Sequence, residues 1–306
     1  MNAPAFVTAA DLQGKAFAPV RWVVPDLIPE GLTILAGKPK LGKSWMVLDI
    51  ALAAAQGGFT LGDRSCIRGD VLYAALEDGQ RRLKERLRKV CLAKAWPPGL
   101  TFCTELPNLT AGGVEAMRDW IRAAADPRLI IVDTFAKVRP TKTRDETPYE
   151  ADYRAAGLLK ALADETCVAN VMVHHLRTMA AEDPFDSVTG TNGLTGAADT
   201  IIVLARNSSG VILYARGRDI EERELAVQFD KAGCRWSVLG AADDVKRSDE
   251  RKAILDAMEA AGEPMSPRAI SDVTDHAYGA TRKLLHHMLR DGEVMRHGRG
   301  QYALPF

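Results

Sequence analysis

Apolar and polar residues follow one pattern up to about residue 205 and a different pattern beyond it. From about residue 31 to 205, short apolar runs rich in β-branched residues are separated by stretches with helical periodicity. Runs that are apolar throughout are typical of strands buried on both faces. The expected strands are LTILAG, DVLYAAL, LTFCTEL, RLIIVDT, VANVMVH and ADTIIVLA, and the expected helices include residues 79–95, 113–125 and 149–165. This alternation predicts an α/β fold with a mostly parallel sheet flanked by helices.

Beyond residue 205 the runs become short and alternating, and turns join them. We expect GVILYARGR, RELAVQFD and CRWSVLG to form antiparallel strands at one edge of the same sheet. Residues 240–250 are polar and poor in apolar side chains. The sequence therefore predicts a main domain over residues 1–240 with an N-terminal extension over 1–30, a linker over 241–248, and a separate domain over 249–306.

The last domain has its own pattern of elements. DERKAILDAMEAAG predicts a helix that ends at Gly262, and in SPRAISDVT Ser266 suits the N-cap and Pro267 the first helical position. AYGATRKLLHHMLRDGEV predicts a longer helix, and MRHGRGQYAL predicts a hairpin. Three helices followed by a two-stranded wing are the order of a small winged-helix domain.

Composition and charge limit the kinds of binding site and the cellular location that we expect. The 306 residues include 40 Lys and Arg and 40 Asp and Glu, so any site for a polyanion must be a local patch. The five cysteines are scattered, and no pair has the spacing of a metal or redox motif. No apolar run approaches the ~20 residues of a membrane span, and the N-terminus lacks the features of a signal peptide. We expect a cytoplasmic protein with no membrane partner.

One motif carries specific chemistry. GKPKLGKS fits the pattern G-x-x-x-x-G-K-[ST] between an expected strand and an expected helix. Its glycines let backbone N–H groups turn towards phosphates, Lys43 supplies a positive charge, and the Ser44 hydroxyl suits Mg²⁺. We therefore expect ATP and Mg²⁺ as cofactors. The expected phosphate-binding residues are Gly37, Lys38, Pro39, Lys40, Leu41, Gly42, Lys43 and Ser44.

Two acidic positions follow apolar strands and should reach the same edge of a parallel sheet. Asp133 ends RLIIVDT, where it can help Ser44 to hold Mg²⁺. Glu77 ends VLYAALE, where it can polarise the water that attacks the γ-phosphate. Asp78 is adjacent and could be the base or the cap of the next helix. We favour Glu77 as the base, with Asp78 supporting it.

The ordered series GKPKLGKS, LEDG, IIVDT, VHHLR, GLTGAADTIIVLAR and GRDIEERELAVQFD resembles the RecA-like ATPases related to plasmid-encoded hexameric RepA helicases, the AAA_25-type group. The resemblance covers roughly residues 20–235. It implies a RecA-like P-loop NTPase core that often forms hexamers, with nucleotide bound between subunits. It also assigns catalytic roles to Lys43, Glu77, Asp133, His174 or His175, and Arg216 or Arg218. The histidine would be the sensor that links the γ-phosphate to a nucleic-acid loop, and the arginine would be a finger for the neighbour's nucleotide.

Two features fit that resemblance less well. Residues 177–193 match the channel loop that contacts single-stranded DNA in such rings, but Arg177 is its only basic residue. A loop ordered by neighbouring subunits is the alternative. Lys38 stands where ParA/MinD-type ATPases carry a signature lysine, although Pro39 and Lys40 replace their small glycines. A dimeric partition-type ATPase therefore remains a minor alternative.

The C-terminal domain has positive side chains on its third helix and its wing. From Arg247 onward nine Lys and Arg balance nine Asp and Glu, so the domain has no net charge to attract phosphate. A protein–protein module is thus an alternative to a DNA-binding one. The expected nucleic-acid contacts are Arg177 in the loop and Arg282, Lys283, Arg296 and Arg299 in this domain.

These expectations lead to rival functions. The first is a hexameric, helicase-type motor acting on DNA in replication, recombination or mobile-element maintenance. The second is an ATP-dependent DNA-binding regulator or loader that switches without unwinding. A third is a scaffold locked by nucleotide, in which Glu77 would be idle.

Overall fold

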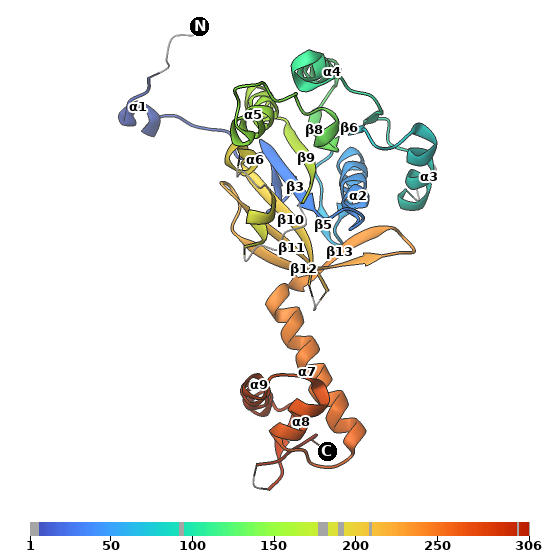
Figure 1. The fold of residues 1–306 in the computed structure, drawn as a ribbon, viewed down its shortest axis with the longest axis vertical. Helices are drawn as coiled ribbons and strands as arrows, with labels where there is room; N and C mark the ends of the chain where they lie inside the picture. Colours follow the sequence, from blue (N-terminus) through green and yellow to red (C-terminus); the bar gives the residue numbers. More distant parts are fainter. Residues whose placement is uncertain are drawn as a thin grey trace. The chain divides into compact units, whose positions relative to one another are not determined.

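The computed structural model describes residues 6–91, 95–176, 183–188, 193–207, 210–298 and 300–305 (Figure 1). The chain divides into two compact units. The larger holds most of residues 1–238, and the smaller is made of Leu239–Phe306 with short pieces of the outer strands.

The larger unit is built on a nine-stranded sheet with the order β13-β12-β11-β10-β3-β9-β8-β6-β7. The six strands from β10 to β7 pair in parallel, as the apolar runs predict. Their bounds are Leu32–Gly37 (β3), Asp70–Ala75 (β6), Leu100–Cys103 (β7), Pro127–Asp133 (β8), Ala169–His175 (β9) and Thr200–Asn207 (β10). The expected edge strands follow as Gly210–Gly217 (β11), Arg223–Asp230 (β12) and Arg235–Ala241 (β13). The predicted α/β fold is confirmed.

Helices cover both faces of this sheet, and Figure 1 shows α2 and α5 on opposite sides of it. One face packs against α4 and α5 in a continuous apolar core that includes Ile34, Ile130, Met117 and Leu159. The other face carries α2, whose side chains are almost all buried. The helix bounds are Ala9–Gln13 (α1), Lys43–Gln56 (α2), Gln80–Val90 (α3), Val114–Ala123 (α4), Pro148–Thr166 (α5) and Gly193–Ala197 (α6). No described helix is long and apolar enough to cross a membrane.

Short elements complete the larger unit. They are the hairpins Trp22–Val24 with Ile28–Pro29 (β1, β2) and Phe59–Thr60 with Arg64–Ser65 (β4, β5), and the helical turns Leu109–Gly113, Phe135–Lys137 and Pro184–Val188. The sequence patterns did not predict them, because elements of two to five residues are too short to show periodicity. Helix α5, by contrast, begins where local chemistry says it should. Thr147 and Glu150 form a reciprocal capping box around Pro148 at the first position.

The smaller unit contains the predicted three helices and hairpin. These are α7 (Ala242–Ala261), α8 (Pro267–Thr274), α9 (Tyr278–Arg290), β14 (Met295–Arg296) and β15 (Tyr302–Ala303). Ile254, Ile270, Leu285 and Met288 form its buried core. Backbone hydrogen bonds in both directions between Met265 and Tyr302 add a bridge to the hairpin. The order of the elements is the predicted one, and the winged-helix assignment stays a prediction.

The linker expected over residues 241–248 is largely helical, because α7 begins at Ala242 rather than at Asp249. Lack of apolar residues does not mean lack of structure here, so the helix begins earlier than the sequence predicts. Asp243 and Asp244 lie in the first turn, where carboxylates favour a helix N-terminus. Lys246 also pairs with Glu250 one turn along. Helix propensity and local charge pairs are enough to extend the helix without a buried face.

Candidate active site

The phosphate loop connects the end of β3 to the start of α2, as the motif predicts. Two of its residues have left-handed backbone, Lys40 at φ 63° and Gly42 at φ 97°. A Cβ on Gly42 would lie 3.0 Å from the Trp236 ring, and one on Gly37 would lie 2.8 Å from the Leu204 carbonyl oxygen. Close packing therefore favours glycine at both positions, and the left-handed backbone favours it at Gly42 as well.

Lys43 is buried at the first position of α2. Its Nζ donates to the carbonyl oxygens of Gly37 at 2.6 Å and Lys38 at 3.0 Å, and lies 3.2 Å from His175 Nδ1. An ammonium group only donates, so Nδ1 accepts and the imidazole proton of a neutral His175 is on Nε2. Burial lowers the pKa of Lys43 to about 8, and the nearby charges of Asp133 and Glu77 oppose that shift.

Asp133 ends β8 and is buried beside Ser44. Its Oδ2 accepts a hydrogen bond of 2.8 Å from the Tyr73 hydroxyl. Burial raises the pKa of Asp133, and hydrogen bonds from Tyr73 and Ser44 oppose the rise. A hydroxyl and a carboxylate side by side offer the oxygen ligands and the negative charge that Mg²⁺ prefers. The structure thus brings together the two residues expected to hold the metal, and their chemistry fits it.

Two neighbouring carboxylates after β6 differ in their surroundings. Glu77 is half-exposed, and its Oε1 lies 3.9 Å from His175 Nε2. Asp78 is buried and forms ion pairs with Arg82, at 3.0 Å, and Arg86. Arg86 is fixed in turn over the Trp45 ring, 5.2 Å from its centre. Glu77 is therefore open to water, whereas Asp78 is engaged in holding α3.

The two histidines at the end of β9 have separate environments, because successive strand residues point to opposite faces. His175 faces Lys43 and Glu77. His174 packs edge-on against Phe135, with ring centres 6.4 Å apart. Burial lowers the pKa of His174 to about 4. Of the two sensor candidates, only His175 contacts phosphate-site residues.

Arg216 and Arg218 lie at the end of the sheet where the parallel strand β3 begins, and the phosphate loop lies at the opposite end of that strand. The Arg218 N–H donates to the Asp199 carbonyl oxygen at 2.9 Å. Asp199 Oδ2 accepts from the N–H of Leu32, the first residue of β3. Lys43 follows the far end of that six-residue strand, which spans roughly 17 Å at about 3.3 Å per residue. Neither arginine is placed to serve the phosphate loop of its own chain.

The two arginines are held to different degrees. The Arg216 guanidinium stacks 3.9 Å from the centre of the Phe185 ring and pairs with Asp183 at 3.1 Å. The Arg218 side chain is 65% exposed and lies 3.4 Å from Asp199 Oδ1. Arg218 is therefore the one that can reach outwards.

One residue that contacts the phosphate loop is not marked by any motif in the sequence. Trp236, in β13, donates its indole N–H to the Gly42 carbonyl oxygen at 3.1 Å. The preceding residue, Arg235, lies 3.3 Å from the buried carboxylate of Asp49 in α2. An edge strand thus supports both the phosphate loop and the helix after it. No local motif links residues 194 positions apart.

The remaining predicted residues are placed as follows. Lys38, Pro39 and Lys40 are exposed, and Leu41, Gly42 and Ser44 are partly buried, along the phosphate loop. Arg282, Lys283 and Arg296 are exposed in the C-terminal unit, apart from this site in the chain. Arg177 and Arg299 lie outside the described residues.

Comparison with solved structures agrees with the fold. A structure described as the ATPase domain of a larger protein superposes with a TM-score of 0.54 at 14% identity, over 69% of this chain and 85% of that one. A DnaB-like replicative helicase, described with its interactions with primase, superposes with a TM-score of 0.51 at 16% identity, over 68% of this chain. The match covers 57% of that helicase chain. At these identities the likeness establishes a RecA-like fold.

Sequence comparison gives the family. A search of curated proteins returns no match. The model of the AAA_25 family, described as an AAA domain, matches residues 2–181, which is more than half of the chain. That range contains the phosphate loop, Glu77, Asp133 and both histidines. The chain is a P-loop ATPase and belongs to the AAA_25 family.

Proposed function

We propose that this ATPase works as a homo-oligomeric ring, a hexamer, that acts on DNA as a helicase-type motor in replication, recombination or mobile-element maintenance. The observation that carries the proposal is the position of Arg218. It is exposed at the sheet edge opposite to its own phosphate loop. A finger at that edge can complete only a neighbour's site, which requires an oligomer. The likeness to a DnaB-like replicative helicase supports this setting.

The residues of the phosphate site have distinct tasks in this proposal. The loop from Gly37 to Ser44 and the ammonium of Lys43 bind the phosphates. Ser44 and Asp133 would hold Mg²⁺, which neutralises phosphate charge when bound. Glu77 orients the attacking water, and its half-exposed carboxylate is open to solvent. His175 lies between Lys43 and Glu77, so it can report whether Lys43 is engaged with a phosphate.

Mixing two inactive variants tests the shared site. Glu77→Gln lacks the base, and Arg218→Ala lacks the finger. A mixed ring contains interfaces where Glu77 of one chain meets Arg218 of the other, so ATP turnover should return on mixing. Mixing Glu77→Gln with Lys43→Ala is the matched control. Lys43 and Glu77 of one chain serve the same nucleotide, so no interface of this mixture has a complete site. Turnover that stays absent in both mixtures, or a monomeric mass by light scattering, would reject the ring.

The switch is the second candidate, and one observation favours it. Asp183 and Asp186, within the expected channel loop, are acidic, and Asp183 pairs with Arg216. An acidic loop suits a regulator or loader better than a motor that grips DNA. Strand displacement on a forked duplex separates the two. Unwinding that depends on ATP supports the motor, and its absence with full DNA-stimulated ATPase supports the switch.

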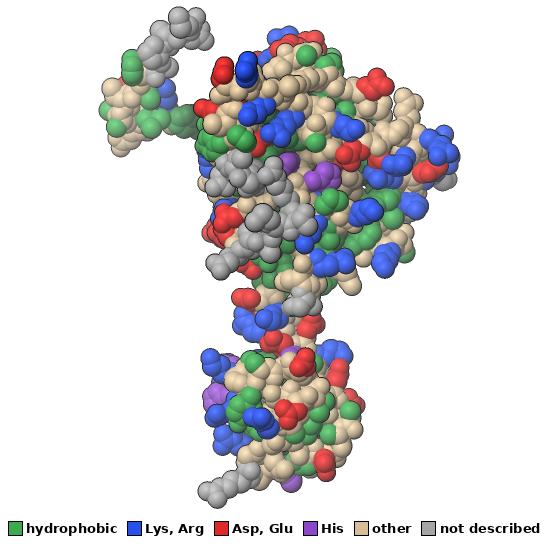
Figure 2. Space-filling view, viewed as in Figure 1, with side chains coloured by type: hydrophobic (Ala, Val, Ile, Leu, Met, Phe, Trp, Pro, Cys, Tyr) green, Lys and Arg blue, Asp and Glu red, His purple; other side chains and the backbone are tan. Residues whose placement is uncertain are grey.

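We also propose that the C-terminal unit binds duplex DNA, although its net charge is zero. Its acids pair with cations outside one groove: Arg251 binds Asp291 and Glu293, and Lys252 binds Asp256. Among the described residues, no acidic side chain lies within ion-pair distance of the cations of that groove. The groove, of about 530 Å³, is lined by Arg282, Lys283, His286, His287, Arg296 and Tyr302. Figure 2 shows blue and purple side chains gathered along one side of this unit.

Salt dependence tests this binding. Each phosphate contact that is lost should reduce the slope of log affinity against log salt by about one. The double variant Lys283→Ala/Arg296→Ala should therefore lower the slope by about two. Lys252→Ala, a cation already paired with Asp256, is the control and should leave the slope unchanged. Equal slopes for the wild type and the double variant would favour a protein–protein role.

A further inference from the structure

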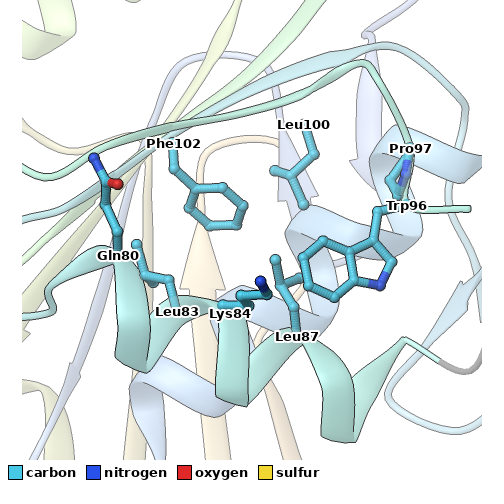
Figure 3. A pocket seen from close by; sticks show the side chains of 8 residues that line it. All are labelled: Gln80, Leu83, Lys84, Leu87, Trp96, Pro97, Leu100 and Phe102. Carbon is cyan, nitrogen blue, oxygen red and sulfur yellow. The ribbon is translucent and has the colours of Figure 1, made fainter.

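A hollow on the larger unit lies between α3 and the edge strand β7, and none of the expected phosphate-site residues lines it. It has a volume of about 540 Å³ and is lined by the apolar side chains Leu83, Leu87, Trp96, Pro97, Leu100 and Phe102. Figure 3 shows Leu100 and Phe102 pointing towards α3, with the Trp96 indole closing one end. Trp96 is 39% exposed, which is unusual for the largest apolar side chain. The hollow could therefore receive a bulky apolar group.

The helix beside this hollow is strongly basic. Helix α3, QRRLKERLRKV, has six Lys and Arg and one Glu in a chain of zero net charge. Arg81, Lys84 and Arg88 are three or four positions apart, so they share the face that borders the hollow. Lys84 itself lines it. In Figure 2, blue side chains crowd the region where Figure 1 places α3.

Among the described residues, these cations have no acidic partner. Asp78 forms ion pairs with Arg82 and Arg86, which lie on other parts of the helix. In the described part of the chain, no carboxylate lies within ion-pair distance of Arg81, Lys84 or Arg88. Unbalanced positive charge beside an exposed apolar hollow is complementary to a ligand with negative charge and an apolar anchor.

We propose that this surface, defined by Arg81, Lys84, Arg88, Trp96 and Phe102, docks a short acidic peptide segment of a partner protein. One bulky apolar side chain of the segment would enter the hollow, and its carboxylates would pair with the α3 cations. Trp96 offers an aromatic contact for the apolar side chain, and Lys84 offers a positive charge at the rim of the hollow.

The geometry favours a peptide over single-stranded DNA. From Arg81 to Arg88 the helix rises only about 10 Å, which matches a few carboxylates rather than a long phosphate backbone. The Phe102 ring already packs on Tyr73, with ring centres 5.6 Å apart, so it is not an open platform for a base. Besides the Trp96 indole N–H, only Gln80 and Lys84 offer polar side-chain groups within the lining. Base edges would therefore find few partners there.

Binding of a labelled probe peptide to the full chain tests the proposal. The probe has four aspartates followed by leucine and phenylalanine, and its binding is measured by fluorescence anisotropy. The control probes replace the aspartates by lysines, or the apolar pair by serines, and neither should bind. Trp96→Ala should weaken binding of the acidic probe at least about tenfold, and Lys84→Glu about fivefold. Lys89→Glu, the same charge reversal on another face of α3, should stay within about twofold.

Three results would overturn the proposal. The first is binding of the acidic probe that is equal in wild type, Trp96→Ala and Lys84→Glu. The second is a single-stranded oligothymidine whose affinity falls in these variants while the acidic probe does not bind, which would make the surface a nucleic-acid site. The third is a fall in oligomeric mass with Trp96→Ala, which would make it a contact between copies of this chain. Circular dichroism confirms the fold of Trp96→Ala, and the exposed Lys84→Glu provides a second variant.

Discussion

The indole N–H of Trp236 is bonded to the carbonyl oxygen of Gly42 at 3.1 Å, so an edge strand fixes the last glycine of the phosphate loop. The same carbonyl accepts the N–H of Met46 in the first turn of α2. A Cβ on Gly42 would lie 3.0 Å from the Trp236 ring, which would have to shift to accept it. The direction of the loop's N–H groups at the start of α2 therefore depends on β13.

Trp236→Phe should have a larger effect on the affinity for ATP than on the free energy of unfolding. The variant keeps an aromatic ring against its neighbour Phe229 but loses the N–H donor. A net hydrogen bond is worth about 1 kcal/mol, which corresponds to a roughly fivefold rise in the Kd for ATP. Titration with a fluorescent ATP analogue measures that change.

Phe229→Leu provides the control for packing. Phe229 lies 5.2 Å from the Trp236 ring and makes no hydrogen bond to the loop. This variant should lower the melting temperature and leave the Kd within about twofold of wild type. If both variants raised the Kd equally, Trp236 would support the loop by packing alone.

Substitutions at the two finger candidates should differ in their effects: Arg216→Ala should mainly lower stability, and Arg218→Ala should mainly lower turnover. Arg216→Ala removes the stacking on Phe185 and the pairing with Asp183, so it should lower the free energy of unfolding by about 1–2 kcal/mol. Arg218→Ala removes an exposed side chain and should change it by less than about 0.5 kcal/mol. In a ring, however, Arg218→Ala should reduce kcat by about 10³-fold. Denaturant unfolding and steady-state ATPase rates make the comparison, and the reverse pattern would move the finger to Arg216.

The sequence is sufficient for the parts of the site that are local. LTILAGKPKLGKS contains its own strand, turn and helix signals, so it places the phosphate loop correctly. IIVDT also predicts a carboxylate at the carboxyl end of a buried strand, which is where Asp133 lies. Parallel topology then brings both to one edge, because every such strand runs in the same direction.

Long-range geometry could not be obtained in this way. The choice between His174 and His175 depends on which face of β9 meets α2, and a shift of one residue would exchange them. Trp236 reaches Gly42 only through the order of the edge strands. The start of α7 escapes prediction because a helix without an apolar face has no hydrophobic periodicity.

Glu77→Gln and Asp78→Asn should have different effects although they are adjacent. Glu77→Gln should retain ATP binding and lose turnover by about 10²–10⁴-fold, since a general base is removed. Asp78→Asn should lower the free energy of unfolding by roughly 2 kcal/mol, because the partly buried Arg86 loses its partner. Nucleotide binding, turnover and denaturant unfolding of both variants test this. Loss of turnover in Asp78→Asn at unchanged stability would make Asp78 the base.

The lowered pKa of Lys43 has opposite consequences for folding and for ATP. Its value is about 8 in the folded chain against an ordinary 10.5. Between these values the unfolded chain binds more protons, so stability rises with pH as the cost of burying the charge is relieved. The phosphates need the ammonium form, so ATP affinity should be constant below about pH 7 and weaken above about pH 8, by at most about tenfold per pH unit.

Calorimetry at about pH 9 tests this linkage directly. ATP should raise the pKa of Lys43 by adding negative charge beside it, so binding should take up a proton from the buffer. The observed heat should then differ between two buffers with different ionisation enthalpies, and the difference should vanish at about pH 6.5, where Lys43 is already charged. Lys38→Ala removes an exposed lysine of the same loop and should not change the proton uptake. Binding without uptake at the higher pH would mean that Lys43 stays charged in the empty site, and that its contacts with Asp133 and Glu77 outweigh its burial.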